Sequence, residues 1–285
     1  MNNKIIHVRQ MEKKIFFSKL ENVYDYYNCS SKNIFLRILR KLHINRYLFY
    51  GNWKRKINDI DTIVFFDTGY EKQFSKYVKK KNKNIRTIFW YWNPIDEKNK
   101  VYLEDENINE FWTYNKFDSH KYKINYNSQV YHVEKQSKMS NFEKYDIIFM
   151  GKDKGRTKMI NEIEQIFKKE KLKYHFNIVS NSEKNFIDYD EYLSELETSK
   201  CILDVNYFLP CGLSLRPLEA LFFEKKLITN NKDIINYDFY DKNNIFILGI
   251  DDISTIKDFI NKPYKKINRE IISYYDFYNW EKRFY

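Results

Sequence analysis

The feature of this sequence that most restricts its fold is a regular alternation of short apolar runs with amphipathic stretches, repeated in both halves. In the first half, strand-like runs at residues 61–66 (DTIVFF) and 85–92 (IRTIFWYW) are separated by a helical stretch. In the second half, a run at 146–150 precedes a helical stretch at 157–170, and another run follows at 174–179. Strands that alternate with helices are typical of parallel sheets. The sequence therefore predicts an α/β protein with two Rossmann-like domains.

The domain boundary is placed at a polar, unpatterned stretch over residues 134–144. We predict an N-terminal domain at 1–134, a C-terminal domain at 135–266 and a helical, aromatic tail at 267–285 that could pack back on the N-terminal domain. Because the two halves are consecutive strand–helix arrays, we expect two parallel sheets that face each other across a cleft. Ligands of such sheets bind beyond the carboxyl ends of the strands. Further strands are predicted at 111–114, 129–133 and 244–248, and further helices from Asp118 and Ser119 onward, at 191–197 and at 253–260.

Composition identifies a globular chain and excludes several classes. The 285 residues are 43% hydrophobic and 31% charged, and no apolar run approaches the ~18–20 residues that a membrane span needs. The stretch MNNKIIHVRQMEKK lacks an apolar h-region and a small-residue cleavage site, so we expect no secretion signal. Cys29, Cys201 and Cys211 cannot all pair and form no CxxC motif, so we expect reduced thiols and a cytoplasmic protein.

The formal charge of +11 favours an acidic partner, but the lysines are scattered and a general compositional bias explains them equally well. No nucleic-acid-binding motif is present, and no nucleic acid is expected as a partner. Residues 31–49 form a basic amphipathic pattern. Two interpretations stay open: a helix that docks its apolar face on its own sheet, or one that rests on an anionic membrane. The apolar positions are Ile34, Phe35, Ile38, Leu39 and Leu42, with Lys32, Arg37, Arg40 and Lys41 around them.

One stretch of the second half, residues 199–230, has the pattern of a ligand site. An apolar run at 201–206 is followed by a loop, a helix and a second strand at 226–229. The loop delivers Gly212, Leu213 and Ser214 to a helix N-terminus, where free N–H groups and the helix dipole favour an anion. Arg216 and Glu219 share a face of that helix because they lie three residues apart. This pattern suits a phosphate with a ribose beside it, although an ordinary βαβ unit with a surface salt bridge has the same spacing.

The turn at 151–156 (GKDKGR) is a second candidate for phosphate binding. It follows a strand, opens a helix, and combines two glycines with Lys152, Lys154 and Arg156. It is neither a Walker A sequence nor a three-glycine dinucleotide motif, and a basic surface turn is the alternative.

Two residues of the first half are candidates for a general base. Asp67 follows a predicted strand and would face the cleft, where it could accept a proton from an acceptor hydroxyl, although it could equally be a helix N-cap. His7 is the second candidate. The triplets Asp59/Asp61 and Asp188/Asp190 could hold a divalent ion. Because neither triplet is distinctive and no zinc motif occurs, we expect no metal and no cofactor.

The segment SKCILDVNYFLPCGLSLRPLEALFFEKKLITNN, followed by YDFYDKNNIFIL, resembles the donor-sugar domain of GT-B glycosyltransferases. WYWNPI and FWTYNKFDSHKYKINYNSQVYHV are similar to the N-terminal half of the same group. The likeness extends over most of residues 60–250 and centres on Gly-Leu-Ser-Leu-Arg-x-x-Glu-Ala. It is strongest to bacterial enzymes that build lipopolysaccharide core or capsular polysaccharide.

This resemblance implies roles for the residues above. The Gly151 turn with Lys152 and Arg156 would lie near the donor diphosphate, and Gly212, Leu213 and Ser214 would present N–H groups to the same phosphates. Lys154 and Arg216 are predicted to bind the donor from their positions in the turn and at the helix mouth. Glu219 matches the glutamate that binds the ribose hydroxyls, and the loop at Ile187 and Tyr189 would lie near the base. Many retaining members carry an acid where this chain has Cys211. Retention or inversion of the anomeric centre therefore stays open.

The resulting expectation is a metal-independent, hexosyltransferase-like GT-B glycosyltransferase. It would move a sugar from a nucleotide diphosphate to a glycan or lipid-linked acceptor, in the cytoplasm or on the inner face of the plasma membrane. Three alternatives are kept: a metal-dependent GT-A transferase that uses Asp188 and Asp190, a non-catalytic protein that binds nucleotide sugars or carbohydrates, and a basic nucleic-acid-binding protein.

Overall fold

The computed structural model describes residues 4–10, 17, 20–30, 33–42, 44, 46–133, 143–180, 188–207 and 212–285. Ile187, Cys211 and most of the predicted linker lie outside these residues. The chain forms two compact units: unit 1 comprises Met1–Ser128 with Tyr285, and unit 2 comprises Gln129–Phe284.

Unit 1 is built on a parallel sheet of six strands in the order β2-β1-β3-β4-β5-β6. The inner strands are buried along their length because both faces are covered, which is why they read as continuous apolar runs. The strands are β1 (Ile5–Arg9), β2 (Val23–Asp25), β3 (Thr62–Phe66), β4 (Arg86–Tyr91), β5 (Glu110–Thr113) and β6 (Asn125–Tyr126).

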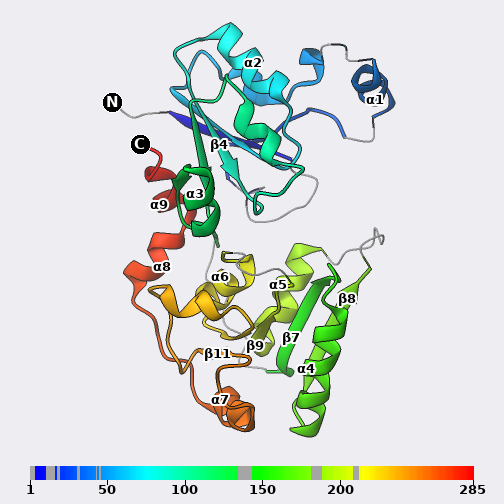
Figure 1. Cartoon of the computed structure of the whole chain (residues 1–285), viewed down its shortest axis with the longest axis vertical. Helices are drawn as coiled ribbons and strands as arrows, with labels where there is room; N and C mark the ends of the chain where they lie inside the picture. Colours follow the sequence, from blue (N-terminus) through cyan, green and yellow to red (C-terminus); the bar gives the residue numbers. More distant parts are fainter. Residues whose placement is uncertain are drawn as a thin grey trace. The chain divides into compact units, whose positions relative to one another are not determined.

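Among the described residues, the connections of unit 1 contain α-helices and short 3-10 turns (Figure 1). The α-helices are α1 (Ile34–Lys41), α2 (Lys72–Lys81) and α3 (Lys116–Tyr122); the 3-10 turns are η2 (Tyr47–Phe49), η3 (Asn52–Arg55) and η4 (Lys100–Glu104). An aromatic core joins these elements to the sheet. Within it, the rings of Tyr26 and Phe74 stack at 4.6 Å, and those of Tyr50 and Trp53 stack at 5.5 Å.

Unit 2 contains a parallel sheet of five strands in the order β11-β10-β9-β7-β8. These are β7 (Tyr145–Lys152), β8 (Tyr174–Val179), β9 (Ser199–Asp204), β10 (Lys226–Thr229) and β11 (Ile245–Ile247). The α-helices are α4 (Thr157–Lys169), α5 (Tyr189–Glu197), α6 (Leu215–Phe222), α7 (Ile256–Asn261), α8 (Arg269–Tyr275) and α9 (Phe277–Lys282); η5 (Lys232–Asn236) and η6 (Ile253–Thr255) are 3-10 turns. Figure 1 shows α4 running alongside β7 and β8.

Each sheet has a point at which the strand order reverses. In unit 1 the chain passes from β1 to β2 on one side and then to β3 on the other. In unit 2 it passes from β7 to β8 on one side and then to β9 on the other. The carboxyl ends of strands at such a reversal are the usual ligand position in open α/β sheets.

Several sequence-based boundaries were wrong. Residues 129–133 are not a strand: only Tyr131 forms an isolated bridge, to Asp276, because this segment leaves the sheet and meets the C-terminal helices. Helix α3 begins at Lys116, before Asp118 and Ser119, because the Asn115 side chain caps it by accepting from Phe117 N.

The structure also contradicts one of the two interpretations of residues 31–49, the helix that docks its apolar face on its own sheet. Only Ile34–Lys41 is α-helical, and Leu36 is the side chain that inserts into the core. The predicted apolar face points outward instead: Ile34, Phe35 and Leu42 are 65%, 66% and 59% exposed. Helix α1 therefore does not dock this face on the sheet of its own unit.

Candidate functional site

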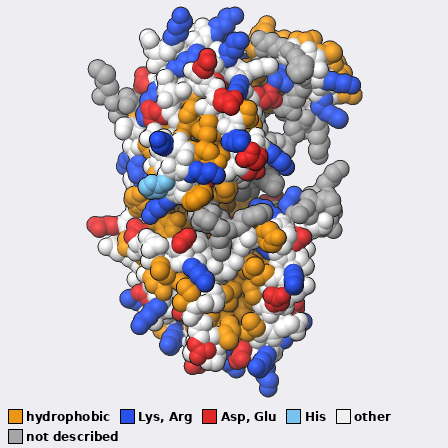
Figure 2. All heavy atoms as spheres, in the orientation of Figure 1, with side chains coloured by type: hydrophobic (Ala, Val, Ile, Leu, Met, Phe, Trp, Pro, Cys, Tyr) orange, Lys and Arg blue, Asp and Glu red, His pale blue; other side chains and the backbone are white. Residues whose placement is uncertain are grey.

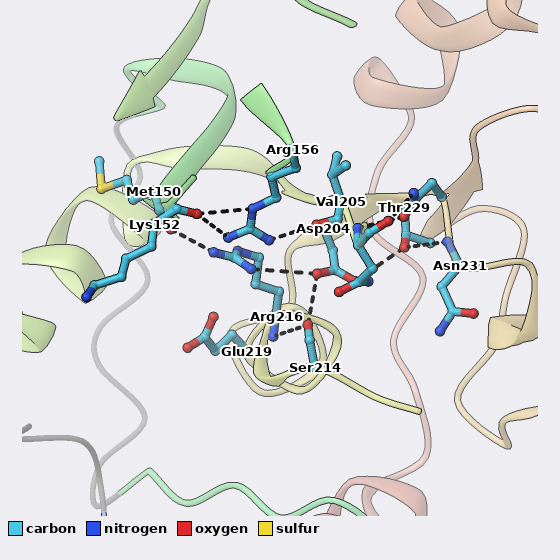
Figure 3. Close-up of polar contacts among 12 residues, drawn as sticks. Met150, Lys152, Arg156, Asp204, Val205, Ser214, Arg216, Glu219, Thr229 and Asn231 are labelled. Atoms are coloured by element: carbon cyan, nitrogen blue, oxygen red, sulfur yellow. Dashed lines mark hydrogen bonds and ion pairs between the residues drawn. The ribbon is translucent and has the colours of Figure 1, made fainter. Parts of the chain in front are cut away.

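Two arginine side chains meet at the reversal point of unit 2, above the carboxyl ends of β7 and β9 (Figure 3). Arg156 follows β7, and Arg216 lies in the first turn of α6. Both guanidinium groups lie over the ring of Phe149, each with its central carbon 4.8 Å from the ring centroid. This cation–π contact holds two like charges close together.

Gly151 provides the space in which the two guanidinium groups approach each other. A Cβ atom at this position would lie 2.6 Å from Arg216 Nη2 and 3.0 Å from Arg156 Nη2. A side chain here would therefore displace at least one guanidinium. Gly151 therefore admits two cations beside its own backbone.

Backbone carbonyls at the ends of β7 and β9 accept hydrogen bonds from these arginines. Arg216 Nη2 donates to Met150 O at 2.8 Å, and Arg156 donates to Lys152 O at 3.0 Å and to Val205 O at 2.7 Å. Burial, and next the charge of Arg216, lower the pKa of Arg156 to about 10. A bound anion would offset this repulsion between like charges in a partly buried site.

Asp204, the last residue of β9, connects the arginine pair to the start of α6. Its carboxylate accepts from Ser214 Oγ at 2.8 Å and from Thr229 Oγ1 at 3.3 Å, and lies 3.7 Å from Arg216 Nη1. Ser214 also caps α6 by accepting from Arg216 N at 3.3 Å. The buried carboxylate thereby fixes both the helix start and one guanidinium.

Glu219 lies one turn along α6 from Arg216 and is held by two tyrosines. Tyr189 Oη donates to its Oε1 at 2.9 Å, and Tyr192 Oη donates to its Oε2 at 2.5 Å. The Tyr131 hydroxyl lies 2.7 Å from that of Tyr189. Burial raises the pKa of Glu219, although both tyrosine hydroxyls and the charge of Arg216 act in the opposite direction. A carboxylate has acceptor capacity beyond two bonds, so it could also receive hydroxyls of a ligand.

The other residues predicted for the donor site are nearby but oriented differently. The Lys152 side chain points away from the arginine pair, and Lys154 has a left-handed backbone (φ 48°) in the turn. Asp153 Oδ1 already accepts from Thr157 N at 2.9 Å, so this N–H at the start of α4 is occupied. The Leu213 side chain is buried, and Gly212 has a φ of +67°.

The two candidate bases lie in unit 1. Asp67 follows β3 and is 5% exposed; its Oδ2 accepts from Asn93 N at 3.1 Å and from Asn93 Nδ2 at 3.0 Å. Burial raises the pKa of Asp67, and the hydrogen bonds from Asn93 oppose that shift. His7 lies in the middle of β1, paired with Val64, and is fully buried. Of the two, Asp67 lies at the carboxyl end of its strand, the edge at which ligands of open α/β sheets bind.

The acidic triplets serve local structure. Asp188 caps α5 by accepting from Asp190 N at 3.1 Å, and Asp61 Oδ2 accepts from Lys4 N at 2.9 Å. Across the described part of the chain, no three His, Cys, Asp or Glu side chains are grouped as metal ligands would be.

Sequence reasoning missed four residues of this site: Phe149, Asp204, Tyr131 and Tyr192. The sequence does contain a signal for Asp204, because an acid that ends an apolar strand lies at the edge of a parallel sheet where ligands bind. The two tyrosines had none, because their contacts to Glu219 and Tyr189 bridge 27 and 58 residues of sequence.

No protein-family model matches this chain. No curated protein matches it either. Among solved structures, 23 chains match. One of these is Anabaena HepE in complex with UDP, which is 9% identical to this chain with a TM-score of 0.51, over 99% of this chain and 98% of HepE. This full-length likeness and the two parallel sheets confirm the predicted fold class, two Rossmann-like domains of GT-B type.

Proposed function

We propose that the protein is a glycosyltransferase that moves a sugar from a nucleotide-diphosphate donor to a glycan or lipid-linked acceptor. The observation that carries this proposal is the guanidinium pair of Arg156 and Arg216 above Gly151, at the reversal point of the unit 2 sheet. The full-length structural likeness to HepE, a protein crystallised with UDP, supports it.

In this proposal the donor diphosphate binds where the two guanidinium groups converge. Breaking the bond between sugar and phosphate leaves additional negative charge on the diphosphate. Two fixed cations in a partly buried site stabilise that charge without needing to reorganise, which is how preorganised electrostatics lowers a barrier. The backbone N–H groups of Gly212, Leu213 and Ser214 and the side chains of Lys152 and Lys154 are proposed to contribute at the edge of the same site.

The ribose is proposed to lie against Glu219. Because Tyr189 and Tyr192 occupy one position on each carboxylate oxygen, ribose hydroxyls would add to these bonds or replace them. Ile187 is proposed to lie near the base. Asp67 is the proposed general base: its raised pKa makes it a stronger base than an exposed aspartate.

The acceptor is proposed to belong to bacterial surface-polysaccharide or lipopolysaccharide synthesis, on the sequence resemblance, and the enzyme to be hexosyltransferase-like and cytoplasmic. We further propose peripheral contact with an anionic membrane through α1. No helix among the described residues is long and apolar enough to cross a membrane.

The exposed face of α1 supports this contact. Figure 2 shows hydrophobic side chains gathered where α1 lies in Figure 1, with Lys and Arg side chains beside them. Ile34, Phe35, Ile38, Leu42 and Leu48 are each at least 48% exposed. Residues 26–58 contain eight Lys and Arg and no Asp or Glu. An apolar face beside cations is the pattern of helices that lie on anionic bilayers.

The direct test of the donor site is a thermal-shift screen with UDP, other nucleoside diphosphates and their sugars. Stabilisation by at least one of these ligands is expected, and Arg216→Ala and Glu219→Ala should each reduce it. Arg269→Ala removes an exposed arginine of the same unit and should leave the shift unchanged. A ligand-induced shift that is equal in all four proteins would overturn the site assignment.

A turnover assay then distinguishes an enzyme from a protein that only binds nucleotide sugars. Hydrolysis or transfer of a nucleotide sugar should persist in EDTA, because the proposed site stabilises the leaving group with arginines. Loss of turnover in EDTA, restored by Mg²⁺ or Mn²⁺, would favour the metal-dependent alternative.

A further inference from the structure

The carboxylate of Glu219 is covered by tyrosine side chains of α5. Glu219 is 3% exposed, and each of its oxygens accepts from one tyrosine, Oε1 from Tyr189 and Oε2 from Tyr192. The two tyrosines lie three residues apart in the helix, with ring centroids 5.7 Å apart, so they cover the carboxylate side by side. A ligand hydroxyl can therefore reach Glu219 only if one of the two tyrosine hydroxyls moves away.

Tyr189 is the tyrosine that moves at the lower cost. It is the first residue of α5, and the ends of a helix open at a lower free energy than its interior. Tyr192 lies one turn further in, where its N–H donates to Asp188 O at 2.9 Å. The hydrogen bond of Tyr192 to Glu219 is also the shorter of the two, at 2.5 Å against 2.9 Å.

A further tyrosine holds Tyr189 in place. Because the Tyr189 hydroxyl donates its only proton to Glu219, its oxygen accepts from the Tyr131 hydroxyl, 2.7 Å away. Tyr131 is fully buried, its N–H donates to Tyr275 O at 3.0 Å, and its ring centroid lies 5.1 Å from that of Phe222. Moving Tyr189 off Glu219 therefore breaks two hydrogen bonds, the one it donates and the one it accepts.

Glu219 lies beside the position proposed for the diphosphate. It is three residues along α6 from Arg216, and residues at this spacing are neighbours on a helix surface (Figure 3). The guanidinium of Arg216 converges with that of Arg156 above Gly151. A ribose that is joined through its C5′ to a diphosphate at the arginine pair is therefore the group that would meet Glu219.

We infer that Tyr189 competes with the ribose of the donor for Glu219, and that Tyr131 strengthens this competition. The inference rests on the proposed function, since it takes the ligand to be a nucleoside diphosphate. Ribose hydroxyls replace the Tyr189 hydroxyl and do not add to it, while Tyr192 keeps its bond and holds the carboxylate. The hydrogen bonds that Tyr189 loses offset part of those that ribose gains. A ligand without ribose hydroxyls leaves Tyr189 in place.

The test is calorimetry of the full-length protein with UDP, or with the nucleoside diphosphate found in the screen, and with the 2′,3′-dideoxy analogue of the same ligand. Tyr189→Phe should increase affinity for the ribose form by about tenfold, because a hydrogen bond to a charged group no longer has to be broken. Tyr131→Phe keeps the Tyr189 bond to Glu219 and should increase affinity by about threefold. Neither variant should change affinity for the dideoxy analogue.

The matched control is Tyr174→Phe, at the amino end of β8. This variant removes another hydrogen bond between a tyrosine and a glutamate of unit 2, from Tyr174 Oη to Glu164 Oε1 at 2.8 Å, and should leave both affinities unchanged. Tyr192→Phe should instead weaken binding of the ribose form, because it removes the bond that holds the Glu219 carboxylate.

The outcomes separate this inference from the proposed function. If the wild type binds a nucleoside diphosphate and Tyr189→Phe binds it no more tightly, the competition is wrong and the donor site stands. An equal gain for the ribose and dideoxy forms would also overturn the competition, because the gain would not come from ribose. A gain in Tyr189→Phe without one in Tyr131→Phe would overturn the role of Tyr131. If neither the wild type nor Tyr189→Phe binds any nucleoside diphosphate, the proposed function and this inference are both wrong.

Discussion

At the scale of single residues, an alanine at Gly151 would crowd the two arginines without straining the backbone. Its φ is not positive, so alanine can adopt this backbone conformation, but the added methyl would lie 2.6 Å from Arg216 Nη2. The atom that must move is the far end of a flexible side chain. The consequence should therefore appear in ligand binding and not in folding.

Gly151→Ala is expected to weaken affinity for UDP, or for the nucleotide found in the screen, by at least about tenfold, because a hydrogen bond to a charged group is lost. The free energy of unfolding should change little. The control is Gly249→Ala: with a φ of +80° and nothing within 4 Å, it should lose about 1–2 kcal/mol of stability and retain nucleotide affinity. Calorimetry and urea titration measure the two effects. An equal loss of nucleotide affinity in Gly151→Ala and Gly249→Ala would contradict the placement of the nucleotide beside Gly151.

Glu219 leads to a prediction about pH. Its pKa in the folded protein is raised above the ordinary value of 4.5, so the folded state binds the proton more tightly than the unfolded state does. This contribution to stability is complete below pH 4.5 and is lost as pH rises through the folded pKa. Glu219→Gln cannot ionise. The stability of Glu219→Gln relative to wild type should therefore increase from about pH 4.5 towards neutrality, as measured by urea denaturation at a series of pH values. A constant difference would show that the Glu219 pKa is not raised.

At the scale of elements, α1 is the helix whose apolar face the rest of its unit leaves uncovered. Phe35→Ser with Leu42→Ser should reduce binding to vesicles that contain phosphatidylglycerol. Partial burial of each side chain contributes about 1 kcal/mol, so a loss of about 30-fold is expected. The effect should be smaller on neutral phosphatidylcholine vesicles, because each nearby cation contributes only at an anionic surface.

The matched control for α1 is Ile235→Ser with Ile250→Ser, two side chains of unit 2 that are 51% and 56% exposed. Vesicle sedimentation of this control should equal that of wild type. Equal sedimentation of the α1 variant would show that its exposed face does not meet the membrane.

The elements that could be predicted from sequence are those whose signal is local. Buried parallel strands such as β3 and β7 are continuous apolar runs, and α4 has a clear helical period. By contrast, α1 has that period too, yet its orientation depends on Leu36 reaching a core formed by distant residues. Arg156 and Arg216 were both predicted from sequence for the proposed donor site, but their shared position over the Phe149 ring was not, because the three residues are separated by up to 67 positions in sequence.

At the scale of the whole molecule, each unit has its own sheet and its own apolar core. A fragment of residues 129–285 should therefore unfold in a single cooperative transition. It contains every residue proposed to bind the donor, so it should also be stabilised by UDP to nearly the same extent as the full chain. Circular dichroism and thermal shift measure both properties. A fragment without a cooperative transition would show that unit 2 depends on unit 1 to fold.

The carbonyl contacts of Arg156 and Arg216 change the polarity of the sheet edge. The carboxyl end of a parallel sheet presents a row of carbonyl oxygens, the wrong partner for a phosphate. Here Met150 O, Lys152 O and Val205 O each accept from a guanidinium, so the edge presents positive N–H groups in their place. Two side chains 60 positions apart in the sequence thereby convert an acceptor surface into a donor surface. Replacing either by a neutral residue would therefore do more than remove one charge: it would expose the oxygen beneath it to the ligand.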